Sequence, residues 1–247
     1  MNNPFTTSLA SYPGSKSSQG VPHKIINQIP PHDAYIEGCL GGGTILRKKR
    51  PATFNFALDP SAMVVSSWEP ASDLQLIQDR FERLFQYDVM DQIRGLRTFV
   101  YLDPPYPLHT RNNRRYYEYE MSLIEHEVLL QFCKWLADYR GILFAISTYP
   151  NELYERELGH WRKISFVSAT RGGPRTELLY MNDTKPQRLH DYSFLGADFR
   201  KRDKAKAKLQ SRKNKIMAME PRERAQLLEW CRIQEENIPG PQLISSK

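Results

Sequence analysis

The sequence predicts an α/β domain with a mainly parallel sheet, followed by a basic helical extension. Short apolar runs of strand type alternate with segments of helical spacing through the first 183 residues, and this alternation is typical of parallel α/β sheets. From residue 184 onward the chain is polar and basic. We therefore expect one domain over residues 1–183 and an extension over residues 184–247, with one or two helices and little core of its own.

Six apolar runs have the length and the bounding residues of buried strands. The first three end at an acidic residue, namely Glu37, Asp59 and Asp103, each followed directly by Gly or Pro. Ligands bind at the carboxyl ends of the strands in such sheets, so these three acids are candidates for one site. The six runs span residues 34–36, 54–58, 98–102, 142–147, 163–168 and 177–181.

Segments with the apolar spacing of helices separate these strands. The clearest helix is expected at residues 122–139, where apolar residues fall at three- and four-residue steps, and Gly141 ends it. The first dozen residues are expected to be unstructured, and residues 11–18 to form a polar loop. The apolar positions of the clearest helix are Leu123, Ile124, Val128, Leu129, Phe132, Trp135 and Leu136, and the other helices are expected at residues 21–29, 44–50, 62–68, 81–93 and 152–158.

Composition and cysteine use narrow the class of protein. Of 247 residues, 40% are hydrophobic and 26% are charged, which suits a globular protein with a substantial core. We find no apolar leader and no run of 18 apolar residues, and we expect a cytoplasmic protein that does not enter the membrane. Three scattered cysteines and six histidines without ligand spacing predict neither zinc nor any other structural metal.

Positive charge is concentrated in one segment. The formal net charge is +7, yet residues 199–217 alone carry nine Lys or Arg and one Asp. Dense positive charge on a short segment attracts a polyanion and makes binding sensitive to salt. The alternative is a solvated basic tail. The predicted nucleic-acid contacts in this segment are Arg200, Lys201, Arg202, Lys204, Lys206 and Lys208.

The tip of the third strand carries the strongest chemical signal, the tetrapeptide Asp103, Pro104, Pro105 and Tyr106. The prolines end the strand and present an acid and an aromatic ring. The Asp103 carboxylate and the Pro104 carbonyl can each accept one N–H of an exocyclic amino group, which favours a nitrogen with an available lone pair. Tyr106 offers a stacking face for a base. A simple turn with a packed tyrosine is the alternative.

Three further features suit a nucleoside ligand. The triplet Gly41, Gly42 and Gly43 lets a ligand approach the backbone closely, although a tight turn would also use it. Asp59 is placed to accept the two hydroxyls of a ribose. Asp79 is a candidate acceptor for the amino group of a bound adenine, with an N-cap role as the alternative.

These motifs, in this order, resemble the Dam-type (D12 class) DNA adenine-N6 methyltransferases, especially short members from phages and prophages. The resemblance covers residues 11–182. The segments that carry it are Tyr-Pro-Gly-Ser-Lys at 12–16, Pro-Pro-His-Asp-Ala-Tyr-Ile-Glu at 30–37, Leu-Gly-Gly-Gly at 40–43, the tip at 103–106, Arg-Arg-Tyr-Tyr-Glu-Tyr-Glu-Met at 114–121, and Thr-Arg-Gly-Gly-Pro-Arg-Thr-Glu-Leu-Leu at 170–179.

The resemblance implies a Rossmann-like fold, S-adenosylmethionine as cofactor and a location in a bacterial or phage-infected cell. It implies direct transfer of the methyl group to N6 of an adenine that has left the duplex. It places Tyr12 and Lys16 at the methionine end of the cofactor. Glu37 and the glycine triplet form the main cofactor loop, Asp59 contacts the ribose and Asp79 the adenine. The tip at 103–106 holds the target base.

Two departures from the family pattern bear on affinity and specificity. Gly38 and Cys39 follow Glu37 where the family usually has Pro and Phe, which predicts a more mobile loop. Only 23 residues separate Asp79 from Asp103, too few for a separate target-recognition domain. The remaining candidates for DNA contact are the basic tail and residues 108–119, unless the latter form only a polar surface loop. The contacts predicted outside the tail are Arg111, Arg114, Arg115, Tyr116, Tyr117 and Arg171.

Base-edge readout needs a module placed in a groove, and no separate recognition domain fits between Asp79 and Asp103. Three functional hypotheses remain open. The first is a DNA adenine-N6 methyltransferase, site-specific or non-specific, with short or relaxed sequence preference and tolerance of single-stranded substrates. The second is a methyltransferase that acts on RNA adenine. The third is a non-catalytic nucleic-acid-binding relative with an altered cofactor loop. The sequence does not reveal the oligomeric state.

Overall fold

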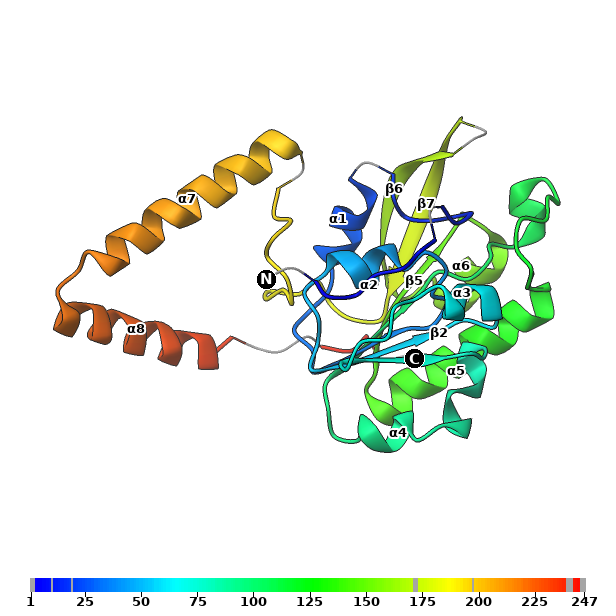
Figure 1. Ribbon diagram of the computed structural model, residues 1–247, viewed down its shortest axis with the longest axis horizontal. Coiled ribbons are helices and arrows are strands. Elements are labelled where there is room, and N and C mark those ends of the chain that lie inside the picture. Colours follow the sequence, from blue (N-terminus) through cyan, green and yellow to red (C-terminus); the bar gives the residue numbers. More distant parts are fainter. Residues whose placement is uncertain are drawn as a thin grey trace.

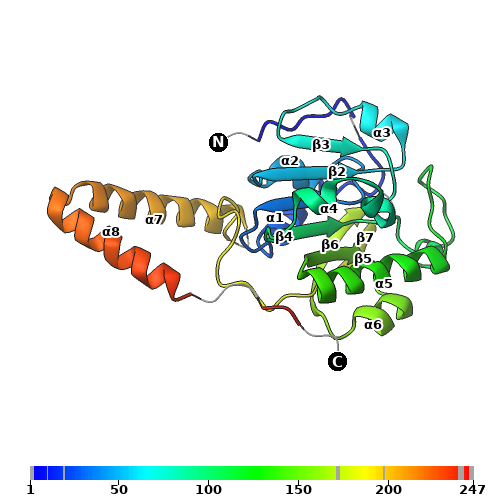
Figure 2. The same ribbon diagram turned by 90° about the horizontal axis from the view of Figure 1, so that it is seen from below.

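A seven-stranded mixed sheet forms the centre of the molecule. Its strand order is β3-β2-β1-β4-β5-β7-β6 (Figures 1 and 2). β1 to β5 run parallel to one another, and β7 runs antiparallel to both β5 and β6. This arrangement confirms the predicted α/β class with a mixed, mostly parallel sheet and flanking helices. The computed structural model describes residues 3–9, 11–18, 20–170, 173–196, 198–238 and 242–244.

The elements alternate along the chain up to β5, and a β-hairpin completes the sheet. The strands are β1 (Ala34–Glu37), β2 (Phe54–Leu58), β3 (Leu74–Ile77), β4 (Thr98–Leu102), β5 (Leu143–Thr148), β6 (Arg162–Thr170) and β7 (Gly173–Met181). The α-helices are α1 (Val21–Ile26), α2 (Thr44–Lys48), α3 (Ala62–Ser66), α4 (Val89–Gln92), α5 (Leu123–Arg140), α6 (Glu152–Leu158), α7 (Phe199–Met217) and α8 (Pro221–Glu236), and the 3-10 helices are η1 (Phe81–Gln86) and η2 (Leu108–Arg111).

Apolar side chains from alternate strand positions build a core on each face of the sheet. In β1, Ile36 points into the core that η1, α4, α5 and α6 cover. Its neighbour Tyr35 points into the core beneath α1, α2 and α3. Because successive strand residues face opposite sides, short buried strands of this kind can hold helices on both faces. The carboxyl edge that results is rigid and can position a site.

Strand β3 is an addition that the sequence analysis does not assign. Its four residues pair in parallel with β2, with Leu58 opposite Ile77. Leu74 and Ile77 are buried, whereas the two residues between them are only partly covered. A short edge strand of this kind has little local signal, because its pairing depends on a neighbour distant in sequence.

Two other expectations are wrong. Residues 81–93 do not form one helix, because the chain makes a 3-10 turn that buries Phe81 and Leu84 and then a separate α4. The side-chain spacing of three residues between Phe81 and Leu84 suits a 3-10 helix, in which such positions eclipse. The N-terminal residues are not unstructured either, since Phe5 is buried in the core and Thr7 forms a β-bridge with Trp68.

Helix α5 begins and ends as its sequence predicts. Ser122 and Glu125 form a capping box, and Gly141 follows the helix in the left-handed conformation. Only part of its predicted apolar face lies in the core, because Ile124, Val128 and several neighbours are exposed.

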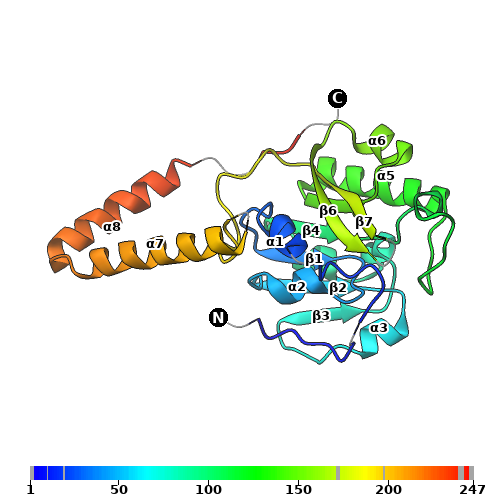
Figure 3. The same ribbon diagram turned by 90° about the horizontal axis from the view of Figure 1, so that it is seen from above.

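The segment after β7 stays attached to the sheet before the chain leaves it. Asp183 and His190 are buried, and the His23 ring of α1 stacks on Phe194 with 4.6 Å between ring centroids. α7 and α8 then project as a V-shaped arm on the side away from α3 (Figure 3). None of the described helices is long and apolar enough to cross a bilayer.

Candidate active site

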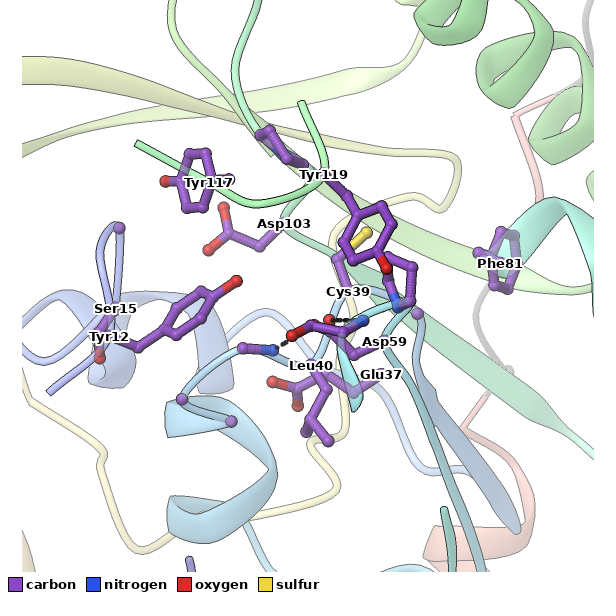
Figure 4. Close-up of a pocket in the computed structure, with 18 of the residues that line it drawn as sticks. Tyr12, Ser15, Glu37, Cys39, Leu40, Asp59, Phe81, Asp103, Tyr117 and Tyr119 are labelled. Atoms are coloured by element: carbon purple, nitrogen blue, oxygen red, sulfur yellow. Dashed lines mark hydrogen bonds between the residues drawn. The ribbon is translucent and has the colours of Figure 1, made fainter. Parts of the chain in front are cut away.

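The three acids predicted to share an edge do so. β1 lies between β2 and β4 in the sheet, and Glu37, Asp59 and Asp103 stand at the carboxyl ends of these strands. All three line a single cavity at this edge of the sheet. Figure 4 shows Asp103, Tyr12 and Tyr117 gathered on one side of the cavity, with Asp59 and Tyr119 on the other.

An ion pair fixes Asp103. The Lys16 ammonium donates to both carboxylate oxygens of Asp103, each at 2.6 Å. The same ammonium lies 3.4 Å from Glu177 on β7. All three side chains are largely shielded from solvent. The cluster therefore joins two carboxylates to one cation, and its members Lys16 and Asp103 line the cavity. Lys16, which the resemblance placed near the methionine end of a cofactor, here contacts the predicted base-binding tip.

The rest of the tip packs against this cluster. The Tyr106 hydroxyl donates to Glu177 at 2.6 Å, and its ring lies edge-on to Tyr149 with 4.6 Å between centroids. Asp103 and Pro105 line the cavity, whereas Pro104 is buried beside them and only 8% of the Tyr106 surface is exposed. Glu177 thus sets the orientation of the tyrosine.

Burial and the neighbouring charges shift the pKa values in this cluster. Burial raises the pKa of Asp103, and Lys16 opposes that rise. Burial alone would lower the pKa of Lys16, but the carboxylates of Asp103 and Glu177 reverse this and the net shift is upward. Lys16 therefore stays protonated and holds the Asp103 carboxylate in place.

Asp59 organises the glycine loop. Its Oδ2 accepts the backbone N–H of Gly41 at 2.9 Å, and its Oδ1 accepts that of Ser61 at 3.0 Å (Figure 4). Burial raises its pKa. A carboxylate has about four lone-pair sites, so these two bonds leave acceptor capacity toward the cavity. Asp59 can therefore hold the loop and bind hydroxyl groups at the same time.

Close packing explains why glycines are needed here. Gly43 has a φ of 52°, and a Cβ at this position would lie 2.2 Å from the Trp68 ring. Gly38, one of the departures from the family pattern, is equally constrained, because a Cβ there would lie 2.3 Å from Leu102 and 2.7 Å from Phe81. The Gly38 N–H also donates to the Tyr101 carbonyl at 3.0 Å. The loop is thus packed and hydrogen-bonded to the strands.

Glu37 lies beneath the start of α2. Its carboxylate accepts the Tyr35 hydroxyl and the Leu46 N–H, both at 2.8 Å. Burial raises the pKa of Glu37 to about 8, although these two hydrogen bonds act in the opposite direction. This residue lines the cavity, so a cation bound there would favour its ionised form.

Residues 112–121 cover the cavity as a closing loop. Tyr117 reaches Tyr12 with 6.1 Å between ring centroids, and the Ser61 hydroxyl donates to Glu118 at 2.7 Å. A buried ion pair between Arg111 and Glu120 fixes the base of the loop. This corrects the prediction that Arg111 contacts nucleic acid: it is 8% exposed, and its guanidinium is occupied by Glu120 and by the Tyr106 carbonyl.

The other predicted nucleic-acid contacts divide into two groups. Arg114, Arg115 and Tyr116 are exposed on the closing loop, while Tyr117 turns into the cavity. Arg171 lies outside the described residues. None of the second group lines the cavity. This group lies on α7 and consists of Arg200, Lys201, Arg202, Lys204, Lys206 and Lys208.

Asp79 is not among the residues that line the cavity. Its carboxylate accepts the Arg80 N–H at 2.8 Å and the Tyr87 hydroxyl at 3.0 Å. The N-cap alternative is not seen either, because η1 begins after Arg80 without a side-chain cap. Glu82, three residues later, lines the cavity instead.

Three acids of this site, Glu177, Glu118 and Glu82, are not predicted from the sequence. Glu177 and Glu118 lie within segments that carried the family resemblance, and that was the only available signal. Their roles depend on contacts with Tyr106 and Ser61, which are distant in sequence. Among the described residues, no group of three or more His, Cys, Asp or Glu is arranged to hold a metal ion.

Comparison with known structures gives distant matches. A methyltransferase dependent on S-adenosylmethionine from Agrobacterium tumefaciens has a TM-score of 0.39 and 12% identity, over 65% of this chain and 58% of that one. An rRNA methylase from Streptococcus thermophilus has a TM-score of 0.38 and 13% identity, over 65% and 93% of the two chains. A magnesium protoporphyrin IX methyltransferase from Synechocystis has a TM-score of 0.38 and 12% identity, over 64% and 74%.

A sequence-family match is more specific. Comparison with curated proteins gives no significant match. Residues 71–164 match the D12 class N6 adenine-specific DNA methyltransferases, which confirms the predicted resemblance over that segment. The segment contains the tip at 103–106 and the closing loop.

Proposed function

We propose that this protein transfers a methyl group from S-adenosylmethionine to N6 of an adenine in DNA. One observation carries the proposal: Asp103 and Pro105 of the Asp-Pro-Pro-Tyr tip line the same cavity as the glycine loop and Asp59. An acceptor for an amino group and a site for a nucleoside cofactor are thus adjacent. The D12 match over residues 71–164 supports adenine in DNA as the substrate.

The cavity fits the cofactor. Asp59 keeps lone pairs for ribose hydroxyls, and the glycine triplet lines the cavity without side chains, so a ligand can approach the backbone of the loop. Glu37 provides a carboxylate for a cationic group. When bound, S-adenosylmethionine supplies a methyl group on a positively charged sulfur. Asp59, Glu37 and the glycine loop would hold it beside Asp103.

The tip prepares the target nitrogen. Asp103 and the Pro104 carbonyl would each accept one N–H of the amino group, which frees the nitrogen lone pair. Lys16 uses part of the Asp103 acceptor capacity and fixes its orientation. The Asp103 carboxylate would also stabilise the positive charge that develops on the nitrogen during transfer.

The closing loop shields this chemistry from water. Tyr12 and Tyr117 flank Asp103 (Figure 4), and the Ser61–Glu118 hydrogen bond ties the loop to the Asp59 side. Exclusion of water strengthens the electrostatic interactions inside a site. Entry of a base that has left the duplex would require Tyr117 to move aside.

We further propose short or relaxed sequence specificity. Between β3 and β4 the chain forms only η1 and α4, so no recognition domain is inserted there. Among the predicted DNA contacts, the exposed Arg114, Arg115 and Tyr116 of the closing loop lie nearest to the cavity. Phosphate contacts position a protein on DNA but do not read its sequence.

The test is transfer of labelled methyl to double-stranded DNA, single-stranded DNA and RNA, followed by mapping of N6-methyladenine. We expect labelled DNA with modified sites that share fewer than four bases. Label on RNA alone would support the second hypothesis from the sequence, and no cofactor binding at all would support the non-catalytic one. A single motif of four or more bases would contradict relaxed specificity.

Asp103→Ala tests the role of the tip. We expect transfer to fall by about a hundred- to a thousandfold, because an acceptor aligned with the reacting group is lost, while most DNA binding remains. Asp91→Ala removes an exposed carboxylate elsewhere and should leave both properties unchanged. Equal loss of transfer and binding in Asp103→Ala, together with a lowered Tm, would show that Asp103 is structural.

A further inference from the structure

The arm, defined as α7 and α8 (residues 199–236), is unlike any other part of the molecule. Neither helix buries a single residue. The two helices meet near residues 218–220 and diverge, so that each is exposed on most sides (Figures 1 and 3). The arm therefore adds little buried apolar surface to the protein, and nearly all of its side chains face solvent.

The basic residues of α7 gather on one side of the helix. At about 100° per residue, six of the nine fall within a sector of about 120°, and the other three fall on the opposite side. We call the six the α7 stripe. The stripe consists of Arg200, Lys201, Lys204, Lys208, Arg212 and Lys215, and the opposite side carries Arg202, Lys206 and Lys213.

The α7 stripe faces away from the rest of the protein. Arg202, on the opposite side, is partly covered, whereas all six residues of the stripe are exposed. Arg202 and Lys206 also lower the pKa of His23 in α1, in addition to the effect of burial. The stripe is therefore turned outward. Within the described residues its only ion pair joins Lys201 to Asp198, at 3.9 Å. The other five cations of the stripe face solvent and have no carboxylate partner in the part of the chain that the structure describes.

The position of the arm separates it from the active site. The arm and α3, which follows the strand that ends at Asp59, lie at opposite ends of the long axis in each view (Figures 1, 2 and 3). The closing loop also lies at the α3 end. A polyanion on the α7 stripe must therefore be a different stretch from the one that presents a base to the cavity.

We infer that the α7 stripe binds the phosphate backbone of double-stranded DNA outside the stretch that contains the target base. The stripe spans about 22 Å at 1.5 Å per residue, and a duplex presents about 13 phosphate charges over that length. Six cations can each approach a phosphate without reading sequence. The choice of DNA rests on the proposed function, and the stripe would make binding depend on duplex length.

Two triple variants of the full chain test this inference at equal loss of charge. Lys204→Ala/Lys208→Ala/Arg212→Ala removes the centre of the stripe, and Arg202→Ala/Lys206→Ala/Lys213→Ala removes the opposite side. Binding of a labelled 40-base-pair duplex is measured without cofactor between 50 and 300 mM salt. The slope of log K against log salt is negative, and we expect it to become flatter by about 2.7 for the stripe variant. For the variant of the opposite side we expect less than half of that change. Equal changes would overturn the inference.

Duplex length gives a second readout. On a 12-base-pair duplex with a central adenine, about 41 Å long, the stripe variant should bind like the unmodified chain. A loss on the short duplex as large as on the long one would show that the stripe acts at the active site, contrary to the inference. Tighter binding of a 40-base-pair RNA duplex than of DNA would also overturn it.

The binding assay is independent of the proposed reaction. A chain that transfers no methyl group but shows the stripe-dependent salt slope would lose the proposed function and keep this inference. A chain that methylates DNA with equal slopes for both variants would do the reverse. Circular dichroism checks that α7 stays helical, as expected because alanine is the strongest helix former.

Discussion

The sheet domain and the arm are stabilised in different ways. The domain buries two apolar clusters, one on each face of the sheet, and these hold Asp59 and Asp103 in register. The arm has local supports instead. Asp198 caps α7 by accepting the Lys201 N–H at 2.8 Å, and Arg232 pairs with Glu229 and Glu236 within α8. A site that needs positioned atoms requires a core, whereas a charged surface requires only a formed helix.

The sharpest test of this difference is a pair of aromatic deletions. Phe144→Ala in β5 removes a fully buried ring, and we expect it to cost about 3–5 kcal/mol of unfolding free energy. Trp230→Ala in α8 removes a ring that is 58% exposed and should change stability by less than about 0.5 kcal/mol. Urea denaturation measures both. A cost above about 2 kcal/mol for Trp230→Ala would mean that the arm packs on a partner.

A second change concerns the closing loop, which belongs to the domain but covers the cavity. Arg111→Met leaves Glu120 buried without its cation, which should cost about 1.5–3 kcal/mol locally. We expect faster proteolysis within residues 112–121 and about tenfold weaker cofactor binding. Arg114→Met, an exposed neighbour, is the control. Unchanged proteolysis in Arg111→Met would show that the ion pair does not hold the loop.

The smallest predicted effect is on pH dependence. Because the pKa of Glu37 is raised to about 8, the residue is mostly protonated at neutral pH in the free protein. A cationic cofactor group favours the ionised form, so binding must release a proton below pH 8. Affinity should fall by up to about tenfold per pH unit below 8 and level off above it. No residue of the arm lines the cavity, so the α7 stripe variant should show the same dependence of cofactor affinity on pH.

Titration calorimetry in two buffers of different ionisation enthalpy measures the released proton. Glu37→Gln should abolish the release and flatten the profile, whereas Asp59→Asn should weaken binding at every pH. A flat profile in the unmodified chain would show that Glu37 does not contact a cation.

Local patterns predicted most elements of the domain. The strands that end at Glu37, Asp59 and Asp103 were recognisable because apolar runs stop at Pro or Gly, and α5 because its capping residues and Gly141 are local signals. β3 was not recognisable, since its pairing with β2 defines it. The division of residues 81–93 into η1 and α4 depends on how Phe81 packs against Gly38 and the core.

For the site, the chain order placed the acids and the glycines, but not their partners. Arg111 illustrates the limit. Within an Arg- and Tyr-rich segment it resembles a phosphate contact, and only the fold brings Glu120 and the Tyr106 carbonyl to its guanidinium. Lys16 and Glu177 likewise meet at Asp103 from distant parts of the chain.

The sequence by itself determined the strand ends, the glycine loop and the basic character of α7, because these follow from residue type and spacing. The tertiary structure decided which charges are paired and which are free. Burial removes water from Arg111, Lys16 and Glu177 and forces each to find a partner, while α7 remains in solvent and keeps its charges exposed. It also decided that the basic helix projects away from the cavity, since the packing of residues 183–194 sets where the arm leaves the sheet.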